Sequence, residues 1–247
     1  RGIIRAQLIF AGGEVMADIS LYYTESGEGF PLIFLHGNGE DSGYFVHQTE
    51  FFSAYFRTIA IDTRGHGRSP RGEGEFSLVR FADDLHDFML SHGIEKAHIL
   101  GFSDGGNIAL YFALKYPSMV GRLVLCGANI SPSGIKRSVQ IPIEIGYSIA
   151  KLFAKKSEGA RVNAEILGLM VNEPDISPEE LSQIKAPTLV IAGTKDMVRR
   201  SHTELIAASI HCAELAFIKG DHFIANKNPD EFNKRVKEFL CEWHSGE

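Results

Sequence analysis

Short apolar runs alternate along this chain with longer stretches in which apolar residues recur every three or four positions. The run 31–35 is continuous, as in a strand buried on both faces of a sheet. The recurrence between Leu78 and Met89 is typical of one face of a helix. The pattern predicts strands at 7–10, 19–23, 31–35, 58–61, 97–102, 123–126, 188–192 and 214–218, with Gly12-Gly13 joining the first two as a hairpin.

Helices are predicted between most of these strands. Ser77 is a good capping residue for a helix that ends near Gly93. Strands that alternate with helices form a parallel sheet covered on both faces, so the fold class is α/β, with about eight strands and an antiparallel start. The other predicted helices are one that carries Phe45, Phe51 and Phe52, one at 107–116, one that begins at Ser201 and one at 229–243.

Residues 131–185 interrupt this alternation, because they contain helical patterns and no evident strand. We interpret them as a helical cap inserted into a core formed by 1–130 and 186–247, within a single domain. The apolar faces of the cap helices are expected to cover a pocket, which favours substrates with an apolar portion. The predicted cap helices carry 143–153, 166–170 and a capping-box start at Ser177-Pro178-Glu179-Glu180.

The cap also concentrates positive charge. These cations either form the solvated faces of amphipathic helices or attract anionic substrates or a membrane surface. They are Lys136, Arg137, Lys151, Lys155, Lys156 and Arg161.

Composition restricts the classes of function. The chain has 247 residues and a net charge of −6, which argues against a nucleic acid as the main partner. It has neither an apolar run of the roughly 20 residues that a membrane span needs nor a C-x-x-C or H-E-x-x-H metal motif. Three cysteines make no disulfide framework, so we expect a cytoplasmic protein without metal or cofactor, as a monomer or homodimer. The chain begins at Arg1, which leaves a removed leader open.

Residues 101–106, Gly-Phe-Ser-Asp-Gly-Gly, carry the first chemical signal. A G-x-S-x-G segment between a strand and a helix forms a tight turn that exposes the serine, and the glycines permit close packing around it. The N–H groups at the start of the following helix point toward that serine and favour negative charge. Ser103 is therefore the candidate nucleophile.

A serine nucleophile needs a base and a carboxylate that orients the base. His222 follows the strand at 214–218, and Asp196 follows the strand at 188–192. Because the carboxyl ends of parallel strands share one edge of a sheet, Ser103, Asp196 and His222 are expected to meet there. Asp221 is a rival acid, but adjacent side chains on an extended segment point apart.

The oxyanion of an acyl-transfer reaction needs N–H donors. His36-Gly37-Asn38-Gly39 follows the strand at 31–35, and its glycines allow the backbone to turn toward the pocket. We assign the donors to the backbone N–H groups of Asn38 and Asp104. The alternative is a plain glycine-rich turn.

Five ordered motifs make the chain resemble the α/β-hydrolase superfamily. They are H-G-N-G at 36–39, D-T-R-G-H-G-R-S at 62–69, G-F-S-D-G-G at 101–106, G-T-K-D at 193–196 and G-D-H-F at 220–223. The resemblance implies an α/β-hydrolase fold in which 62–69 is a structural turn, so that Arg64, His66 and Arg68 are scaffold residues. A serine at 103 argues against the dehalogenases and epoxide hydrolases of this fold, which use an aspartate there.

Within the superfamily, residues 103–106 and 127–129 are similar to the biphenyl-hydrolase-like and valacyclovir-hydrolase-like enzymes. Those enzymes cleave amino-acid esters, and the aspartate after their nucleophile can meet the ammonium of the substrate. The resemblance makes Asp104, with Asn38 beside it, a candidate for substrate binding. Alternatively, Asp104 is an acid favoured at a helix N-terminus.

These residues predict a serine hydrolase that cleaves a carboxylic ester or a related small acyl substrate through an acyl-enzyme. Two alternatives use the same fold. An acyltransferase or perhydrolase passes the acyl group to another acceptor, and a ligand receptor shows slow turnover and a change in the cap.

Overall fold

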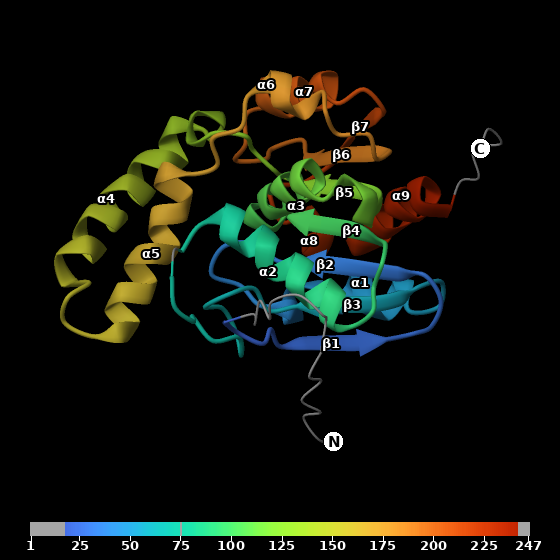
Figure 1. Ribbon diagram of the computed structural model, residues 1–247. Helices are drawn as coiled ribbons and strands as arrows, with labels where there is room; N and C mark the ends of the chain where they lie inside the picture. Colours follow the sequence, from blue (N-terminus) through green and yellow to red (C-terminus); the bar gives the residue numbers. More distant parts are fainter. Residues whose placement is uncertain (1–17, 75, 242–247) are drawn as a thin grey trace.

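The computed structural model describes residues 18–74 and 76–241. Within that part of the chain, seven strands form one sheet in the order β1-β3-β2-β4-β5-β6-β7 (Figure 1). Only β1 runs antiparallel to its neighbour, so the predicted mostly parallel α/β sheet is confirmed. The strands are β1 Tyr23–Ser26, β2 Pro31–Leu35, β3 Arg57–Ile61, β4 Ala97–Phe102, β5 Val120–Cys126, β6 Thr188–Gly193 and β7 Ala213–Ile218.

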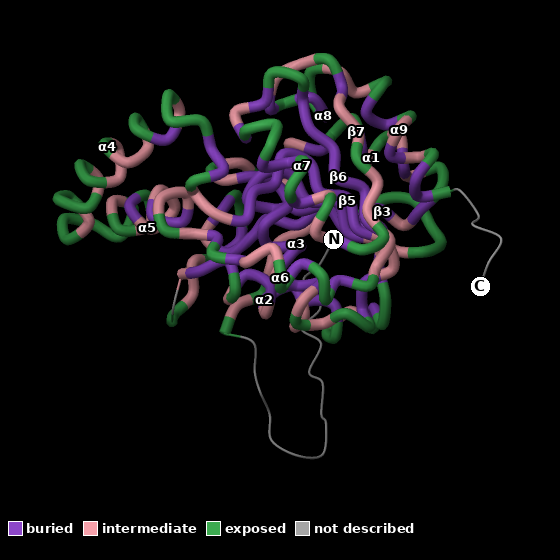
Figure 2. The backbone as a smooth tube through the Cα atoms, turned by 90° about the horizontal axis from the view of Figure 1, so that it is seen from above, coloured by how far each residue is buried: buried purple, intermediate pink, exposed green. Residues whose placement is uncertain are grey.

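Alternate residues of each strand join two apolar clusters on opposite faces of the sheet, as the period of two in a strand requires. On β2, Ile33 and Leu35 join the cluster that includes residues of α2, α3 and α7. Leu32 and Phe34 join the cluster that includes residues of α1, α8 and α9. Figure 2 shows these buried strands in purple at the centre of the molecule. Both faces of the sheet are therefore covered.

The helices lie close to their predicted positions. Ser77 caps α2 by accepting a hydrogen bond from the N–H of Arg80, and Ser177 forms the predicted capping box with Glu180. The α-helices are α1 Val46–Phe52, α2 Leu78–Ser91, α3 Asp104–Lys115, α4 Arg137–Phe153, α5 Glu158–Asn172, α6 Pro178–Leu181, α7 Arg200–Ser209, α8 Ile224–Lys227 and α9 Pro229–Cys241. Short 3-10 segments are η1 Ser42–Phe45, η2 Pro117–Met119 and η3 Pro132–Gly134. No described helix is both long and apolar enough to cross a bilayer.

The start of the chain differs from its prediction. The predicted strand at 7–10 and the hairpin through Gly12-Gly13 lie outside the described residues. The strand expected at 19–23 begins only at Tyr23. Tyr22 instead lies against the 62–69 turn, where its N–H donates to Ser69 Oγ (2.8 Å) and its carbonyl accepts from Asp62 N–H (2.9 Å).

The segment between β5 and β6 divides into two parts. Helices α4 and α5 project from the body of the molecule (Figure 1). Helix α6 instead packs on the core, because Leu181 and Ile184 are fully buried in the same cluster as α2 and α3. The expectation that the apolar face of the first cap helix covers a pocket is wrong for Ile149, Leu152 and Phe153, since all three side chains are exposed.

A buried ion-pair network holds the 62–69 turn. The guanidinium of Arg64 is completely buried, and its Nε and Nη2 donate to both carboxylate oxygens of Asp84 on α2 (2.7 and 2.6 Å). Its Nη1 and Nη2 donate to the carboxylate of Asp18 (3.0 and 2.7 Å). A buried guanidinium needs such bidentate partners because its desolvation is costly. The ion pair of Arg64 with Asp84 therefore fixes the turn to α2, 20 residues further along the chain.

We predict that Asp84→Ala destabilises the protein by about 3–5 kcal/mol, because it removes the buried one of the two carboxylates that pair with the completely buried Arg64. Asp83→Ala is a matched control. Asp83 accepts from the half-exposed Lys115 and from the Tyr116 hydroxyl (2.7 Å), so its loss should cost about 1–2 kcal/mol. Chemical denaturation of the two variants measures both values, and equal losses would contradict the role given to Arg64.

Candidate active site

Ser103 occupies a strained turn between β4 and α3. It is the only non-glycine residue with a positive φ among the described residues, at φ 53° and ψ −121°. Its N–H donates to the carbonyl of Cys126 on β5 (2.8 Å), which fixes the turn to the sheet. A Cβ at Gly105 would lie 2.0 Å from the carbonyl oxygen of Leu35, and one at Gly101 would lie 2.2 Å from that of Gly105. Only glycine allows this close packing.

The structure brings the three predicted catalytic residues together. The distance from Ser103 Oγ to His222 Nε2 is 3.0 Å, and that from His222 Nδ1 to Asp196 Oδ1 is 2.7 Å. All three side chains lie almost entirely out of solvent. Asp221, the rival acid, instead bonds to the N–H of Phe223 and to exposed Lys227. The structure thus brings together the three residues that their positions after strands predicted to meet.

Backbone contacts hold the acid and the imidazole in this arrangement. The carboxylate of Asp196 accepts the N–H of Val198 (2.9 Å) and that of Gly193 (3.3 Å). A Cβ at Gly127 would lie 2.7 Å from Cε1 of His222, so the backbone after β5 lies directly against the imidazole. The acid can therefore hold a proton on Nδ1, which leaves Nε2 free to accept the proton of the serine.

The two predicted oxyanion residues contact each other through their side chains. Asn38 Nδ2 donates to Asp104 Oδ2 (2.8 Å) and to the carbonyl of Ile166 on α5 (2.9 Å). The structure thus links the loop after β2, the nucleophile turn and the cap. Across the described part of the chain, the backbone N–H groups of Asn38 and Asp104 make no hydrogen bond within the protein.

Asp104 is held from a second side. Asn107 Nδ2 donates to Asp104 Oδ1 (3.1 Å) and to Asn129 Oδ1 (3.1 Å). Burial raises the pKa of the Asp104 carboxyl, while the amides of Asn38 and Asn107 act in the opposite direction. Both carboxylate oxygens therefore already have donors.

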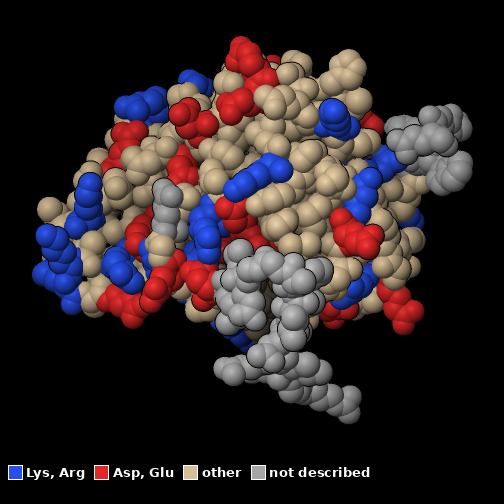
Figure 3. All heavy atoms as spheres, in the orientation of Figure 1, with Lys and Arg blue, Asp and Glu red and all other residues tan. Residues whose placement is uncertain are grey.

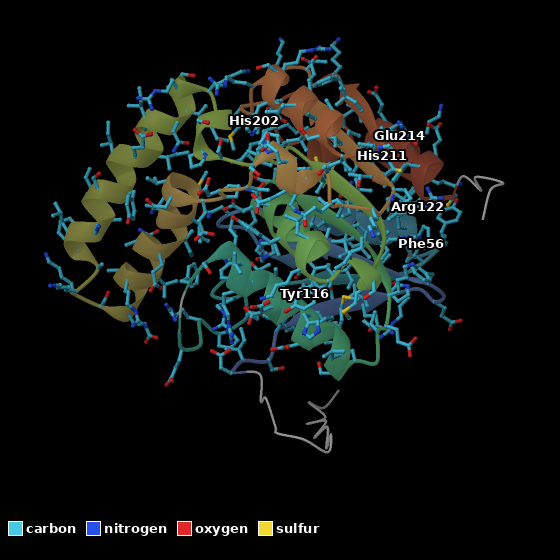
Figure 4. The ribbon with its side chains drawn as sticks, turned by 45° about the horizontal axis from the view of Figure 1, so that its top comes forward. Phe56, Tyr116, Arg122, His202, His211 and Glu214 are labelled. Atoms are coloured by element: carbon cyan, nitrogen blue, oxygen red, sulfur yellow. The ribbon has the colours of Figure 1, made fainter. Side chains whose placement is uncertain are left out.

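His202 on α7 lies beside the segment that leads from β5 to α4 (Figure 4). Its Nε2 accepts the N–H of Ile130 (3.1 Å), so this ring nitrogen carries no proton. Burial lowers the pKa of His202, in keeping with a neutral ring. A Cβ at Gly134 would lie 2.5 Å from the ring. The imidazole thus fixes the path by which the chain enters the cap.

Three residues beside the triad were not singled out from the sequence. The ring of Phe102 lies 4.8 Å from that of His222, and Tyr44 stacks on Phe102 at 4.4 Å. Among residues 18–74 and 76–241, the buried Tyr44 hydroxyl has no hydrogen-bond partner. Glu40 accepts the N–H of Gly37 (3.1 Å) and so supports the loop that carries Asn38. Glu40 follows the H-G-N-G motif directly, and this position is the one feature of the sequence that could have pointed to its place beside the site.

Within the described residues, no cluster of three or more His, Cys, Asp or Glu side chains could hold a metal ion.

We predict that Glu40 makes stability depend on pH. Burial raises the pKa of this carboxyl from 4.5 to about 7. Between these values the folded chain keeps a proton that the unfolded chain releases, so stability falls as pH rises through that window. Glu40→Gln keeps an acceptor for Gly37 and removes the ionisation. The free energy of unfolding of the variant, relative to wild type, should therefore increase from pH 4.5 to pH 7. Denaturation curves across this range test it, and a constant difference would contradict it.

The chain matches a known family model and known proteins. The family model of the α/β-hydrolase fold matches residues 31–155. The chain is 30% identical to 2-hydroxy-6-oxo-6-phenylhexa-2,4-dienoate hydrolase from Comamonas testosteroni, over 91% of this chain and 92% of that protein. It is also 30% identical to the serine hydrolase BPHL from Mus musculus, over 90% of this chain and 83% of the relative.

Solved structures show the same relationship. The crystal structure of a hydrolase from Pseudomonas aeruginosa PA01 superposes with a TM-score of 0.77 at 26% identity, covering 91% of this chain and 95% of that one. An esterase from Thermogutta terrifontis gives a TM-score of 0.76 at 25% identity, with 90% and 93% covered. With the family model and both relatives spanning this much of the sequence, the chain belongs to the α/β-hydrolase fold family, and the relatives described here are hydrolases.

Proposed function

We propose that the protein is a serine hydrolase that cleaves a carboxylic ester or a related small acyl substrate through an acyl-enzyme intermediate. The observation that supports this best is the hydrogen-bonded chain from Ser103 through His222 to Asp196, with contacts of 3.0 and 2.7 Å. Nucleophile, base and orienting acid within such distances are what nucleophilic catalysis by serine requires.

In the proposed reaction, His222 Nε2 takes the proton of Ser103 while Oγ attacks the carbonyl carbon. The backbone N–H groups of Asn38 and Asp104 stabilise the oxyanion, and the N-terminus of α3 favours the same charge. His222 then protonates the leaving alcohol, and the ester bond breaks. Water, deprotonated by His222, attacks the acyl-enzyme. The bond from the acyl carbon to Ser103 Oγ then breaks, the imidazolium of His222 protonates Oγ, and the acid is released. Asp196 stabilises the imidazolium in both steps.

A second candidate substrate comes from one relative. The match to 2-hydroxy-6-oxo-6-phenylhexa-2,4-dienoate hydrolase makes a dienoate of this kind a substrate to compare with simple esters. If kcat/KM for the dienoate exceeds that for the best p-nitrophenyl ester, the dienoate is favoured as the substrate class. Product analysis with competing alcohol or peroxide acceptors separates hydrolysis from acyl transfer in the same assays.

We predict that Ser103→Ala lowers kcat for p-nitrophenyl esters by roughly 10³–10⁶-fold, because no other group can form the acyl-enzyme. Fluorophosphonate should label the wild type and leave the variant unlabelled. Ser133→Ala, at an exposed serine in η3, is the matched control and should keep wild-type turnover. Wild-type activity in Ser103→Ala would end the proposed mechanism.

We predict that Asp104→Asn does not change the preference between neutral and aminoacyl esters by more than about twofold. Two amides already engage both oxygens of Asp104, so an ammonium would have to displace one of them. The ratio of kcat/KM values is the right measurement, because any loss of folded enzyme cancels in it. A selective loss of about 10-fold or more for the aminoacyl ester would instead assign Asp104 to ammonium binding.

A further inference from the structure

The outer face of cap helix α4 carries an apolar stripe that no other described part of the chain covers. We define the outer stripe as Ile141, Ile145, Ile149 and Leu152, whose spacings of four, four and three residues place them on one side of a helix. Their exposed fractions are 42%, 56%, 53% and 77%. Phe153 at the end of α4 is 45% exposed beside them. Isolated exposed hydrophobics are common, but a continuous stripe on one helix marks an interaction surface.

The opposite face of α4 already has its partner. Gln140 Nε2 donates to the carbonyl of Met170 on α5 (3.2 Å), and Tyr147 lies against Gly168 of the same helix. The outer stripe therefore faces away from both α5 and the core. Figure 2 shows α4 in the colours of exposed and half-buried residues, apart from its buried Gln140. A shallow hollow lined by Glu144, Ile145, Ser148, Ile149 and Leu152 runs along this face.

Positive charge gathers at the distal end of the α4–α5 hairpin, on a chain whose net charge is −6. Between 151 and 161 there are four exposed cations, Lys151, Lys155, Lys156 and Arg161, and one carboxylate, Glu158, which pairs with Arg161 (3.8 Å). Lys155 and Lys156 lie at the tip, while Lys151 and Arg161 line the hollow between α4 and α5. Figure 3 shows Lys and Arg gathered at this end of the molecule. The Nζ of Lys156 lies 4.3 Å from the centre of the Phe153 ring, so its stem follows apolar surface while its ammonium reaches water.

We propose that the outer stripe of α4 and the four cations of the α4–α5 turn form a docking surface for an anionic lipid bilayer. A helix with one apolar face and flanking lysines lies in the plane of a membrane interface, with its apolar side chains among the acyl chains and its cations at the headgroups. The helix does not cross the bilayer, in keeping with the absence of any spanning helix in the described residues.

A second copy of the chain fits this surface less well. A symmetric dimer through the outer stripe would place the same surface on both sides of the contact. Where the two α4 helices run parallel, the four cations of each turn would approach those of the partner. Where they run antiparallel, each turn would meet the N-terminal end of the other α4, which carries Lys136 and Arg137. An anionic bilayer offers apolar and negative groups together, and so it complements both halves of the surface.

The test is co-sedimentation of the full chain with phosphatidylcholine vesicles that contain about one third phosphatidylserine, and with vesicles of phosphatidylcholine alone. We expect binding to the anionic vesicles at about 0.1 M salt and release at about 1 M, where the Debye length falls to about 3 Å. Replacing Lys151, Lys155 and Lys156 together by Gln should weaken binding by about 10-fold or more, since each cation near such a surface contributes roughly fivefold.

The apolar half is tested separately by replacing Ile145, Ile149 and Leu152 together by Ser, which should also abolish binding. Matched controls are Leu90→Ser, at a side chain 52% exposed on α2, and the triple change of Lys185, Lys219 and Lys234 to Gln. Both controls should bind like wild type. Thermal unfolding of every variant confirms that these exposed changes leave the fold intact.

Three outcomes would overturn the proposal. The first is no binding to either kind of vesicle. The second is equal binding to both, unaffected by the lysine changes. The third is a dimer that the Ser variant converts to a monomer while the wild type ignores vesicles, which would assign the stripe to a second copy. None of these outcomes bears on Ser103, whose labelling is measured without lipid.

Discussion

The backbone turn at Ser103 is the constraint on which the rest of the site depends. A residue other than glycine at φ 53° costs on the order of 1–3 kcal/mol, and it persists only where its surroundings allow no alternative. Here the surroundings are backbone: Gly105 packs against the carbonyl of Leu35, and the N–H of Ser103 bonds to Cys126. Strands β2 and β5 thus clamp the turn from both sides. The strain places Oγ beyond the sheet edge, where a base can reach it.

Parallel strands then bring the remaining groups to that edge. Asp196 follows β6 and His222 follows β7, and these two strands are paired in register from Thr188–Ala213 to Gly193–Ile218. Gly193 and Gly127 admit the loop and the imidazole where any side chain would collide. These two glycines act like Gly105 in the serine turn, because each lets another part of the chain lie directly against the backbone. The charged group of the site is the buried carboxylate of Asp196, which the backbone N–H groups of Gly193 and Val198 hold in place.

The sequence predicted the sheet and the three convergent side chains because both follow from position relative to strands. Each of Ser103, Asp196 and His222 lies just after an apolar run. Parallel pairing of the strands then brings their carboxyl ends, and these residues, to one edge of the sheet. The contacts that refine the site follow no such rule. Asn38 reaches the carbonyl of Ile166 only because α5 lies over the loop, and Glu40 becomes half-buried through packing that no local pattern records. The contact between Asn38 and Ile166, 128 residues apart, depends on how α5 is placed over the loop.

Helix α4 also shows what the sequence pattern leaves undetermined. Periodicity establishes which residues share a face, but it does not say what that face meets. The helix is apolar on two sides: Tyr147 packs on α5, while Ile145, Ile149 and Leu152 face outward. A single cap hairpin has only one partner for two apolar sides, so one of them must meet either solvent or another body. Hydrophobic area left in water gains none of the roughly 25 cal/mol per Å² that burial supplies. A partner surface that binds apolar side chains and cations together explains why an exposed apolar stripe lies beside four cations.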